Sequence, residues 1–137
     1  FVPFVIDQAK NSGSANYVET GEHRVSAVHV EDAADLYLLA LETSTAKGLY
    51  NVSAETISLK EINESAARLL GLKTKSISAE EAKKQFGKMF DFLSINNQLD
   101  ATKAKRDLSW SPRDFYSITD EIENGSYRKF AENTGEI

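Results

Sequence analysis

The stretch RVSAVHVEDAADLYLLALE, residues 24–42, decides the fold. Its segment Ser26–Val30 is apolar and β-branched and is too short for a helix, so it predicts a strand. Glu31 or Asp32 then begins a helix, because a carboxylate is favoured at the positive end of a helix dipole. The stretch therefore predicts a strand that runs directly into a helix, with His29 at the junction.

The predicted helix has almost no polar face. Between Ala33 and Leu41 the one polar side chain is Asp35. A helix that is apolar on every side is expected to be buried on most sides. We therefore expect this helix at an internal junction between two layers of structure.

Similar patterns extend outward along the chain. The sequences Ser58 to Glu61 and Ser78 to Glu81 are capping boxes, in which a hydroxyl and a carboxylate satisfy the free amides of a helix start. Helices are predicted over 2–10, 59–70, 79–86 and 100–108 and from 118 onward. Strands are predicted over 17–18, 49–53 and 75–78, a loop over 11–16, and either a helix or a strand over 88–95. The chain is thus expected to be α/β, helix-rich, with a few short strands that form an incomplete sheet.

The composition limits the partners. The chain has 137 residues with 16 basic and 21 acidic side chains, a net charge of −5, and no cysteine. A length of this order suits one domain with a real core. The acidic balance argues against nucleic acid, and no apolar run is long enough for a membrane span. Disulfides and thiolate catalysis are excluded, and we expect a cytoplasmic location.

No complete catalytic constellation is visible. The sequence contains no Gly-rich phosphate loop, no GxSxG and no HExxH. His23 and His29 are six residues apart on different predicted elements, which makes a poor metal site. No tyrosine is followed four residues later by lysine. We therefore predict no catalytic residue and no metal ligand in this chain. The start at Phe1, inside a predicted helix, suggests a piece of a longer protein.

An ordered series of motifs resembles the extended and atypical short-chain dehydrogenases/reductases, the NAD(P)-dependent epimerase/dehydratase family. AVHVEDAADLYLLALE resembles the family motif [VI]H-V-x-D-x-A, and GLYNVSAETISLKEINESAARLLGL resembles its G-x-Y-N strand and following helix. YVETGEHR is similar to the glycine turn before the first motif, and SISAEEAKKQFG to a segment of the atypical members. TKAKRDLSWSPR and IENGSY resemble the family's LGW-P signature and closing segment.

The resemblance implies a particular architecture. Residues 1–137 would be a single C-terminal, substrate-binding portion, and the Rossmann domain with the cofactor fingerprint and the Tyr-x-x-x-Lys pair would lie outside the chain. The full-length parent would use NAD or NADP, and this chain alone would bind neither. Its partners would be the missing Rossmann domain and a small-molecule substrate. Self-association of the isolated chain is also expected, because open apolar faces seek partners.

The resemblance also suggests substrate-binding residues. The position of His29 lies near the substrate cleft in the family, where it either contacts substrate or is a half-buried histidine bonded to backbone. An arginine four residues before that position binds the diphosphate in nucleotide-sugar members, but here Val25 stands there and Arg24 is offset by one. On a strand such an offset turns the side chain to the opposite face, unless a bulge restores it. Arg24 is thus a candidate diphosphate ligand or a solvated surface residue.

Four further candidates have structural alternatives. Asn51 could line the cleft or satisfy local backbone, and Trp110 could be a lid or a core anchor. Phe86 and Phe90 could shape the substrate pocket or belong to an ordinary core. Ser109 replaces the glycine of LGW, so the local turn is expected to differ.

The sequence therefore favours the substrate-binding part of an NAD(P)-dependent nucleoside-diphosphate-sugar epimerase/dehydratase-like oxidoreductase, inactive by itself. Two alternatives remain open. One is a non-catalytic relative that binds a dinucleotide or a partner, and the other is a stand-alone interaction domain. The sequence upstream of Phe1 would distinguish an enzyme from the non-catalytic relative. Resistance to proteolysis would distinguish a stand-alone domain from a piece of a larger fold.

Overall fold

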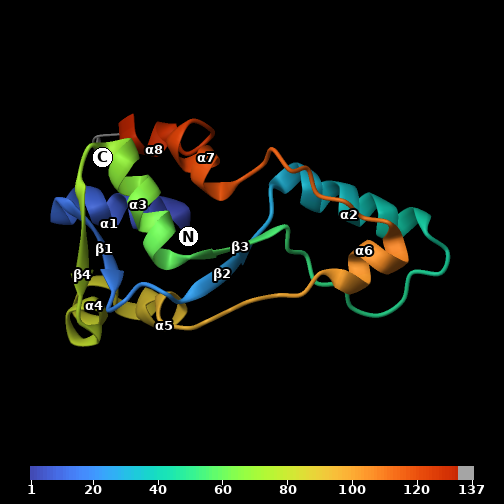
Figure 1. Ribbon diagram of the computed structural model, residues 1–137, viewed down its shortest axis with the longest axis horizontal. Helices are drawn as coiled ribbons and strands as arrows, with labels where there is room; N and C mark the ends of the chain where they lie inside the picture. Colours follow the sequence, from blue (N-terminus) through green and yellow to red (C-terminus); the bar gives the residue numbers. More distant parts are fainter. Residues whose placement is uncertain (133–137) are drawn as a thin grey trace.

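The computed structural model describes residues 1–132 and shows two lobes joined by a narrow waist (Figure 1). The larger lobe contains α1 (Val2–Ser12), β1 (Ser14–Val18), α3 (Leu59–Leu70), β4 (Lys73–Ile77), α4 (Ala79–Phe86), η1 (Gly87–Met89), α5 (Phe90–Leu93), α7 (Ile118–Glu123) and α8 (Arg128–Glu132). The smaller lobe contains α2 (Val30–Glu42) and α6 (Thr102–Leu108). The waist is formed by β2 (Arg24–Ala27) and β3 (Glu55–Ser58).

The described strands form two separate pairs. Strands β1 and β4 are parallel, in register from Ser14–Lys73 to Val18–Ile77. Strands β2 and β3 are antiparallel, in register from Arg24–Ser58 to Ala27–Glu55. The predicted fold class, mixed α/β with few short strands, is confirmed.

Each lobe has its own apolar core. In the larger lobe, Ile6 of α1, Ile62 of α3 and Ile122 of α7 are fully buried at the centre of one cluster. In the smaller lobe, Leu36 of α2 packs with Leu108 and Trp110. Because the two clusters are separate, the relative position of the lobes depends on the waist and on the segment that leads from α6 to α7.

Both capping boxes are present as predicted. Ser58 Oγ accepts from the amide of Glu61, whose carboxylate accepts from the amide of Ser58, and α3 ends at Gly71 in the left-handed conformation. Ser78 and Glu81 form the same pair at the start of α4. The local signals were strong here because each cap satisfies amides that the helix itself cannot satisfy.

Several strand predictions were wrong in position. Residues 49–53 form no strand, and the side chain of Leu49 is 91% exposed; the strand β3 begins later, at Glu55. A β-branched sequence becomes a strand when a neighbouring strand pairs with it, and the described part of the chain pairs residues 55–58 instead. The predicted loop at 11–16 is reduced to Gly13, because α1 runs to Ser12 and β1 begins at Ser14, three residues before the predicted strand at 17–18.

The junction in the deciding stretch lies earlier than predicted, since the strand ends three residues before Val30 and the helix begins one residue before Glu31. Strand β2 spans Arg24–Ala27, and α2 begins at Val30 with His29 as its N-cap, so neither Glu31 nor Asp32 is the cap. The imidazole Nδ1 of His29 accepts from the amide of Glu31 at 3.2 Å. Histidine can serve as the N-cap in place of a carboxylate, because the unprotonated nitrogen of its ring accepts a hydrogen bond from a backbone amide.

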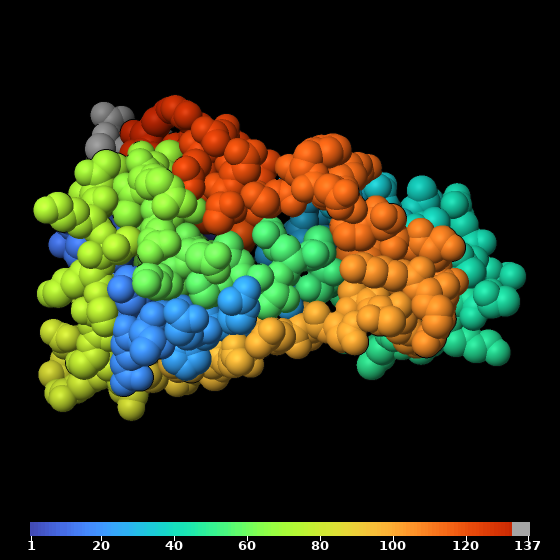
Figure 2. Space-filling view, viewed as in Figure 1, coloured from blue at the N-terminus to red at the C-terminus, as the bar shows by residue number. Residues whose placement is uncertain are grey.

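Helix α2 is less buried within this chain than its sequence suggests. Only Asp32 and Leu36 of α2 are buried, because α6 covers one face and the rest faces outward. In the space-filling view, α2 lies at the outer end of the smaller lobe (Figure 2). The expectation of burial on most sides is therefore wrong for the described chain.

The turn after α6 is the one that glycine would favour. Ser109 adopts a left-handed conformation with φ of 54° and ends α6. The expected change of turn did not occur, and the serine adopts the strained geometry instead. Among the residues described, no helix is both long and apolar enough to cross a membrane.

The two capping serines give a matched test of helix stability. Replacing Ser58 with Ala should lower the free energy of unfolding by about 1–2 kcal/mol, since α3 packs on α1, β1 and α7. Replacing the exposed Ser78 with Ala should cost less, about 0.5 kcal/mol. Urea denaturation of both variants measures the difference, and an equal or larger loss for Ser78→Ala would contradict the central role of α3.

The strained turn gives a second test. Ser109→Gly should raise the free energy of unfolding by about 1 kcal/mol, because glycine adopts positive φ without steric cost. Ser111→Gly, an exposed serine two residues on, is the control and should not stabilise the protein. A fall in thermal midpoint for Ser109→Gly would show that the serine side chain makes a compensating contact.

Candidate functional site

A pocket of about 330 Å³ opens at the waist, between the lobes. Its walls come from the β2–α2 junction, the start of β3, and the segment that leads into α7 and out of it. Apolar atoms of Val28, Val30 and Ile118 line it beside a polar group formed by His29, Glu55 and Glu121. The pocket therefore has the mixed lining that small-molecule sites usually show.

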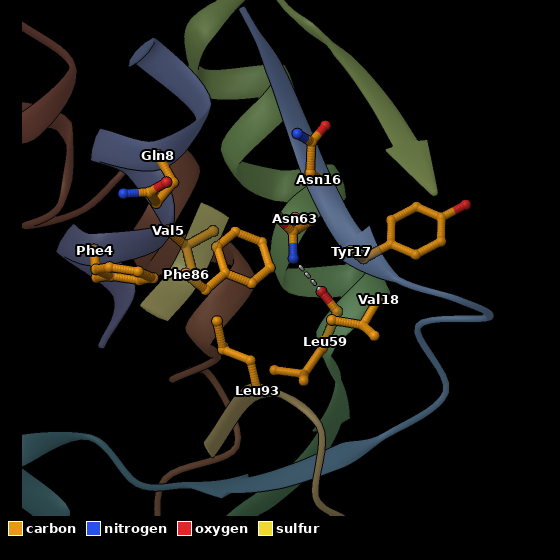
Figure 3. Close-up of a pocket in the computed structure, with 10 residues that line it drawn as sticks. All are labelled: Phe4, Val5, Gln8, Asn16, Tyr17, Val18, Leu59, Asn63, Phe86 and Leu93. Carbon is orange, nitrogen blue, oxygen red and sulfur yellow. Dashed lines mark hydrogen bonds between the residues drawn. The ribbon is translucent and has the colours of Figure 1, made fainter. Parts of the chain in front are cut away.

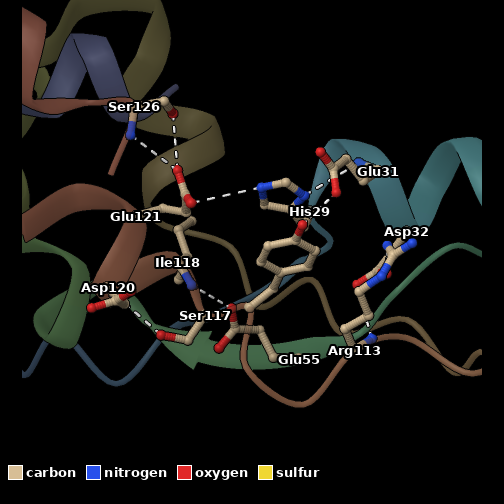
Figure 4. A network of polar contacts seen from close by, with 11 residues as sticks. His29, Glu31, Asp32, Glu55, Arg113, Ser117, Ile118, Asp120, Glu121 and Ser126 are labelled. Carbon is tan, nitrogen blue, oxygen red and sulfur yellow. Dashed lines mark hydrogen bonds and ion pairs between the residues drawn. The ribbon is translucent and has the colours of Figure 1, made fainter. Parts of the chain in front are cut away.

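His29 is held in the pocket wall by three contacts (Figure 4). Its Nδ1 caps α2, and its ring stacks on Tyr116 with centroids 3.6 Å apart and planes within 9°. Its Nε2 lies 3.6 Å from Oε1 of Glu121. Because Nδ1 accepts a hydrogen bond, the neutral ring carries its proton on Nε2, which faces Glu121.

Tyr116 is fixed as a hydrogen-bond donor. Its hydroxyl donates to the carboxylate of Glu31, and that bond raises the pKa of Tyr116 above its ordinary value. The guanidinium of Arg113 lies over the same ring, 5.6 Å from its centroid. A tyrosine with a raised pKa stays protonated, so Tyr116 is not suited to act as a general base.

Glu121 is fixed as a charged acceptor. Its Oε2 accepts from the backbone amide of Ser126 at 3.1 Å and from the Ser126 hydroxyl at 3.0 Å. These bonds hold the pKa of Glu121 below its usual value, so the group is a carboxylate at neutral pH. The loop approaches so closely that a Cβ on Gly125 would lie 2.5 Å from Oε2 of Glu121, which explains a glycine there.

The segment that carries Tyr116 is tied to α2 by a buried carboxylate. Asp32 is 1% exposed; its Oδ1 accepts from the Arg113 guanidinium at 2.6 Å and its Oδ2 from the Arg113 amide at 3.1 Å. The indole of Trp110 donates to the backbone oxygen of Asp32 at 2.9 Å. We call this group of Asp32, Trp110 and Arg113 the Asp32 clamp.

His29 is the one predicted substrate-binding residue that lines this pocket. Arg24 lies on β2, and its guanidinium donates to the backbone oxygen of Thr56 at 2.9 Å. Val25, at the position of the family's arginine, is 5% exposed and belongs to the core of the larger lobe. Without a bulge in the regular β2–β3 register, Arg24 and Val25 point to opposite faces.

The other four candidates lie elsewhere. Asn51 donates to the backbone oxygen of Asp100, and Trp110 is 2% exposed within the core of the smaller lobe. Phe86 is buried in the larger lobe, in contact with a cavity of about 10 Å³ that has room for about one water molecule (Figure 3). Phe90 packs against the same core. The structure thus does not bring these residues together with His29.

Sequence reasoning missed Tyr116, Glu121 and Glu55. Glu55 accepts from the amide of Ile118 at 2.6 Å and so fixes the start of α7 beside β3. These residues come from distant parts of the chain, and no local motif indicated that they meet. Within residues 1–132, no group of three or more metal-ligating side chains could hold a metal ion.

Comparison with curated proteins finds uncharacterized relatives that are longer than this chain. No family model matches the chain. An uncharacterized protein of Schizosaccharomyces pombe is 39% identical over 121 residues, which are 88% of this chain and 41% of the relative. An uncharacterized protein of Saccharomyces cerevisiae is 28% identical over the same shares. The chain thus spans about two fifths of the length of the curated relatives that it matches.

Solved structures of similar fold include epimerases and dehydratases, some of them in complex with NAD. Helicobacter pylori ADP-L-glycero-D-manno-heptose-6-epimerase matches with a TM-score of 0.66 and 21% identity, over 96% of this chain and 37% of that one. Bacillus cereus UDP-glucuronic acid 4-epimerase in complex with NAD matches with 0.64 and 16%, over 96% and 38%. The chain therefore has the fold of about two fifths of a Rossmann-like epimerase or dehydratase.

The Asp32 clamp can be tested with two neighbouring carboxylates that share one arginine. Asp32→Asn should lower the free energy of unfolding by about 2 kcal/mol, because the Arg113 guanidinium loses a buried charge partner. Asp35→Asn should cost at most about 0.5 kcal/mol, since Asp35 is 52% exposed and its ion pair with Arg113 is solvated.

Fluorescence of Trp110, the single tryptophan, reports the same change. Its emission should shift to longer wavelength in Asp32→Asn and stay unchanged in Asp35→Asn. Equal effects of the two substitutions would show that burial of Asp32 does not decide the strength of the clamp.

Proposed function

We propose that this chain is the substrate-side portion of an NAD(P)-dependent oxidoreductase of the epimerase/dehydratase kind, inactive by itself and acting in the cytoplasm. The rest of the site would come from a nucleotide-binding part of the same protein that docks on the smaller lobe. The observation that carries the proposal is an unpartnered apolar face on α2. The fold likeness and the pocket at the waist support it.

The apolar face is a continuous stripe of large side chains. It consists of Val30 (75% exposed), Tyr37 (68%), Leu38 (53%) and Leu41 (84%), which we call the apolar row. With 3.6 residues per turn these four positions lie on one side of the helix. Leu49 and Phe115, also largely exposed, are further large apolar side chains of the same lobe or of the segment leaving it. Contiguous exposed apolar surface of this kind marks an interaction site.

The proposed occupant is a Rossmann-type domain. The relatives are more than twice as long as the matched segment, so the length of their chains would accommodate such a domain. The motif resemblance places the same helix at the boundary between the cofactor-binding and substrate-binding parts.

The described residues do not fit a dinucleotide. A phosphate binds best at a helix N-terminus that follows a strand, where free amides point at the anion. Here β3 runs into α3 and β4 into α4, but the carboxylates of Glu61 and Glu81 already accept from amides at those turns. These bonds also lower the pKa of both groups, which keeps them negatively charged. The proposed cofactor, NAD or NADP, would therefore be held by the other part of the protein.

The chemistry of this chain is then binding and orientation. Hydride transfer between a nicotinamide and a carbinol or sugar carbon would occur at the mouth of the waist pocket. His29, Tyr116 and Glu121 would hold substrate oxygens in a fixed geometry, which raises the rate by reducing the entropy lost on reaction. A nucleoside-diphosphate sugar would further require a cation for its phosphates, for which Arg24 was the candidate.

The docking proposal is tested by two charges on the apolar row. In a protein that extends upstream of Phe1, the double substitution Tyr37→Glu/Leu41→Glu should reduce nicotinamide-dependent turnover at least tenfold, because the charges would have to be buried at the interface. Ile95→Glu, at an exposed loop position outside the row, is the control and should change turnover less than twofold.

The isolated chain gives the complementary measurement. It should show no nicotinamide-dependent turnover, and the double substitution should reduce its self-association in analytical ultracentrifugation. Turnover by residues 1–137 alone would contradict the proposal. A longer protein that binds the dinucleotide but lacks the upstream Tyr-x-x-x-Lys pair would instead be a non-catalytic relative.

A further inference from the structure

The geometry points to an uncharged, largely apolar alcohol or carbonyl compound as the ligand of the waist pocket, in place of a nucleoside-diphosphate sugar. This inference rests on the proposed function, because it assumes that the waist pocket is the substrate side of the site. It concerns the charge that the pocket can accept.

The pocket walls carry negative charge. Glu55 and Glu121 both line it, and the hydroxyl of Tyr116 is bonded to a third carboxylate, that of Glu31. The bonds from Ser126 keep Glu121 ionised at neutral pH. An anionic ligand would therefore be repelled by at least two carboxylates at short range in a partly desolvated site.

No arginine or lysine among the described residues lines the pocket to offset this charge. Arg113, the nearest guanidinium to the Tyr116 ring, is paired with Asp32 and Asp35. Arg24 is bonded to Thr56 on the opposite face of β2 from the buried Val25. A diphosphate needs such cations, since bidentate guanidinium bonds are the usual way to hold it.

The polar groups of the pocket that can still form hydrogen bonds suit a hydroxyl or a carbonyl oxygen of a ligand. Nε2 of His29 lies 3.6 Å from Glu121, which is too long for a good hydrogen bond. Its N–H can therefore donate to a ligand oxygen that lies beside the pair on the pocket side, and Glu121 can accept from a ligand hydroxyl. Val28, Val30 and Ile118 supply the apolar surface around this polar point.

Four probes test the inference on this chain, without a cofactor. Benzyl alcohol, benzoate and benzylammonium share a ring and differ mainly in charge, and UDP carries the diphosphate of a nucleotide sugar. Titrations are followed by backbone amide shifts of Glu31 and Ser126 and by the imidazole signals of His29. Benzyl alcohol should shift these signals with a dissociation constant at least roughly tenfold lower than those of benzoate and UDP.

Matched substitutions on α7 identify the cause. Glu121→Gln removes one of the two carboxylates that line the pocket and should reduce the preference for benzyl alcohol over benzoate to less than threefold. Glu123→Gln, whose parent carboxylate is paired with Arg68 away from the pocket, should leave the preference unchanged. Glu55→Gln, which keeps an oxygen for the amide of Ile118, serves as a second variant if Glu121→Gln does not fold.

Tighter binding of benzoate or UDP, with shifts at the same residues, would overturn the inference. So would tighter binding of benzylammonium than of benzyl alcohol, which would assign a cationic ligand. Absence of shifts at these residues with every probe, up to the solubility limit, would overturn the assignment of a ligand site. None of these results depends on turnover, so the docking proposal can fail while the selectivity of the pocket holds, and the reverse.

Discussion

The buried carboxylate of Asp32 is the interaction on which the arrangement of the pocket depends. It lies in the first turn of α2 and binds both the guanidinium and the amide of Arg113. Three residues further on, Tyr116 stacks on His29, the N-cap of the same helix. The start of α2 therefore holds the wall at the β2–α2 junction against the segment that leads into α7, because the His29 cap, the Asp32 clamp and the stacked rings all lie at its first turn. A buried charge is costly unless it is fully bonded, and Asp32 has both oxygens occupied.

Several acidic side chains of this protein accept hydrogen bonds from its own backbone amides, as Asp32 does. Glu61 and Glu81 cap helices, Asp32 holds a segment, and Glu121 closes a loop around Ser126. Each carboxylate is bonded to backbone amides of the chain itself. At the β3–α3 and β4–α4 turns, where a phosphate would bind free amides, the protein's own carboxylates are already bonded. A division of the site into two parts is consistent with this, with phosphate recognition in one part and an acidic, phosphate-free pocket in the other.

How much could be predicted from sequence varied with the range of the interactions. Helices with complete local caps, such as α3 and α4, were predicted nearly to the residue, because Ser58 and Ser78 act within three residues of their partners. Strands were predicted less well, since a strand is defined by its neighbour: Glu55–Ser58 pairs with β2, and Leu49–Ser53 pairs with nothing in the described chain. His29 was found because it lies in a motif. Tyr116 and Glu121 were not, because their roles arise where residues some 90 positions apart in the chain meet.

The apolar row and the pocket share one origin in the deciding stretch. The second half of this stretch was expected to form a helix that is buried on most sides, and in this chain most of that helix is exposed to water. The expected burial of α2 and its observed exposure agree if a surface outside residues 1–132 covers the helix. One face of α2 packs on α6 and the opposite face is apolar. Covering this second face as well would stabilise the protein, because it removes apolar surface from water. Because His29 caps this helix, a domain that docks on the apolar row would lie next to the mouth of the pocket. The same contact that completes the burial of α2 would then close the site over its ligand.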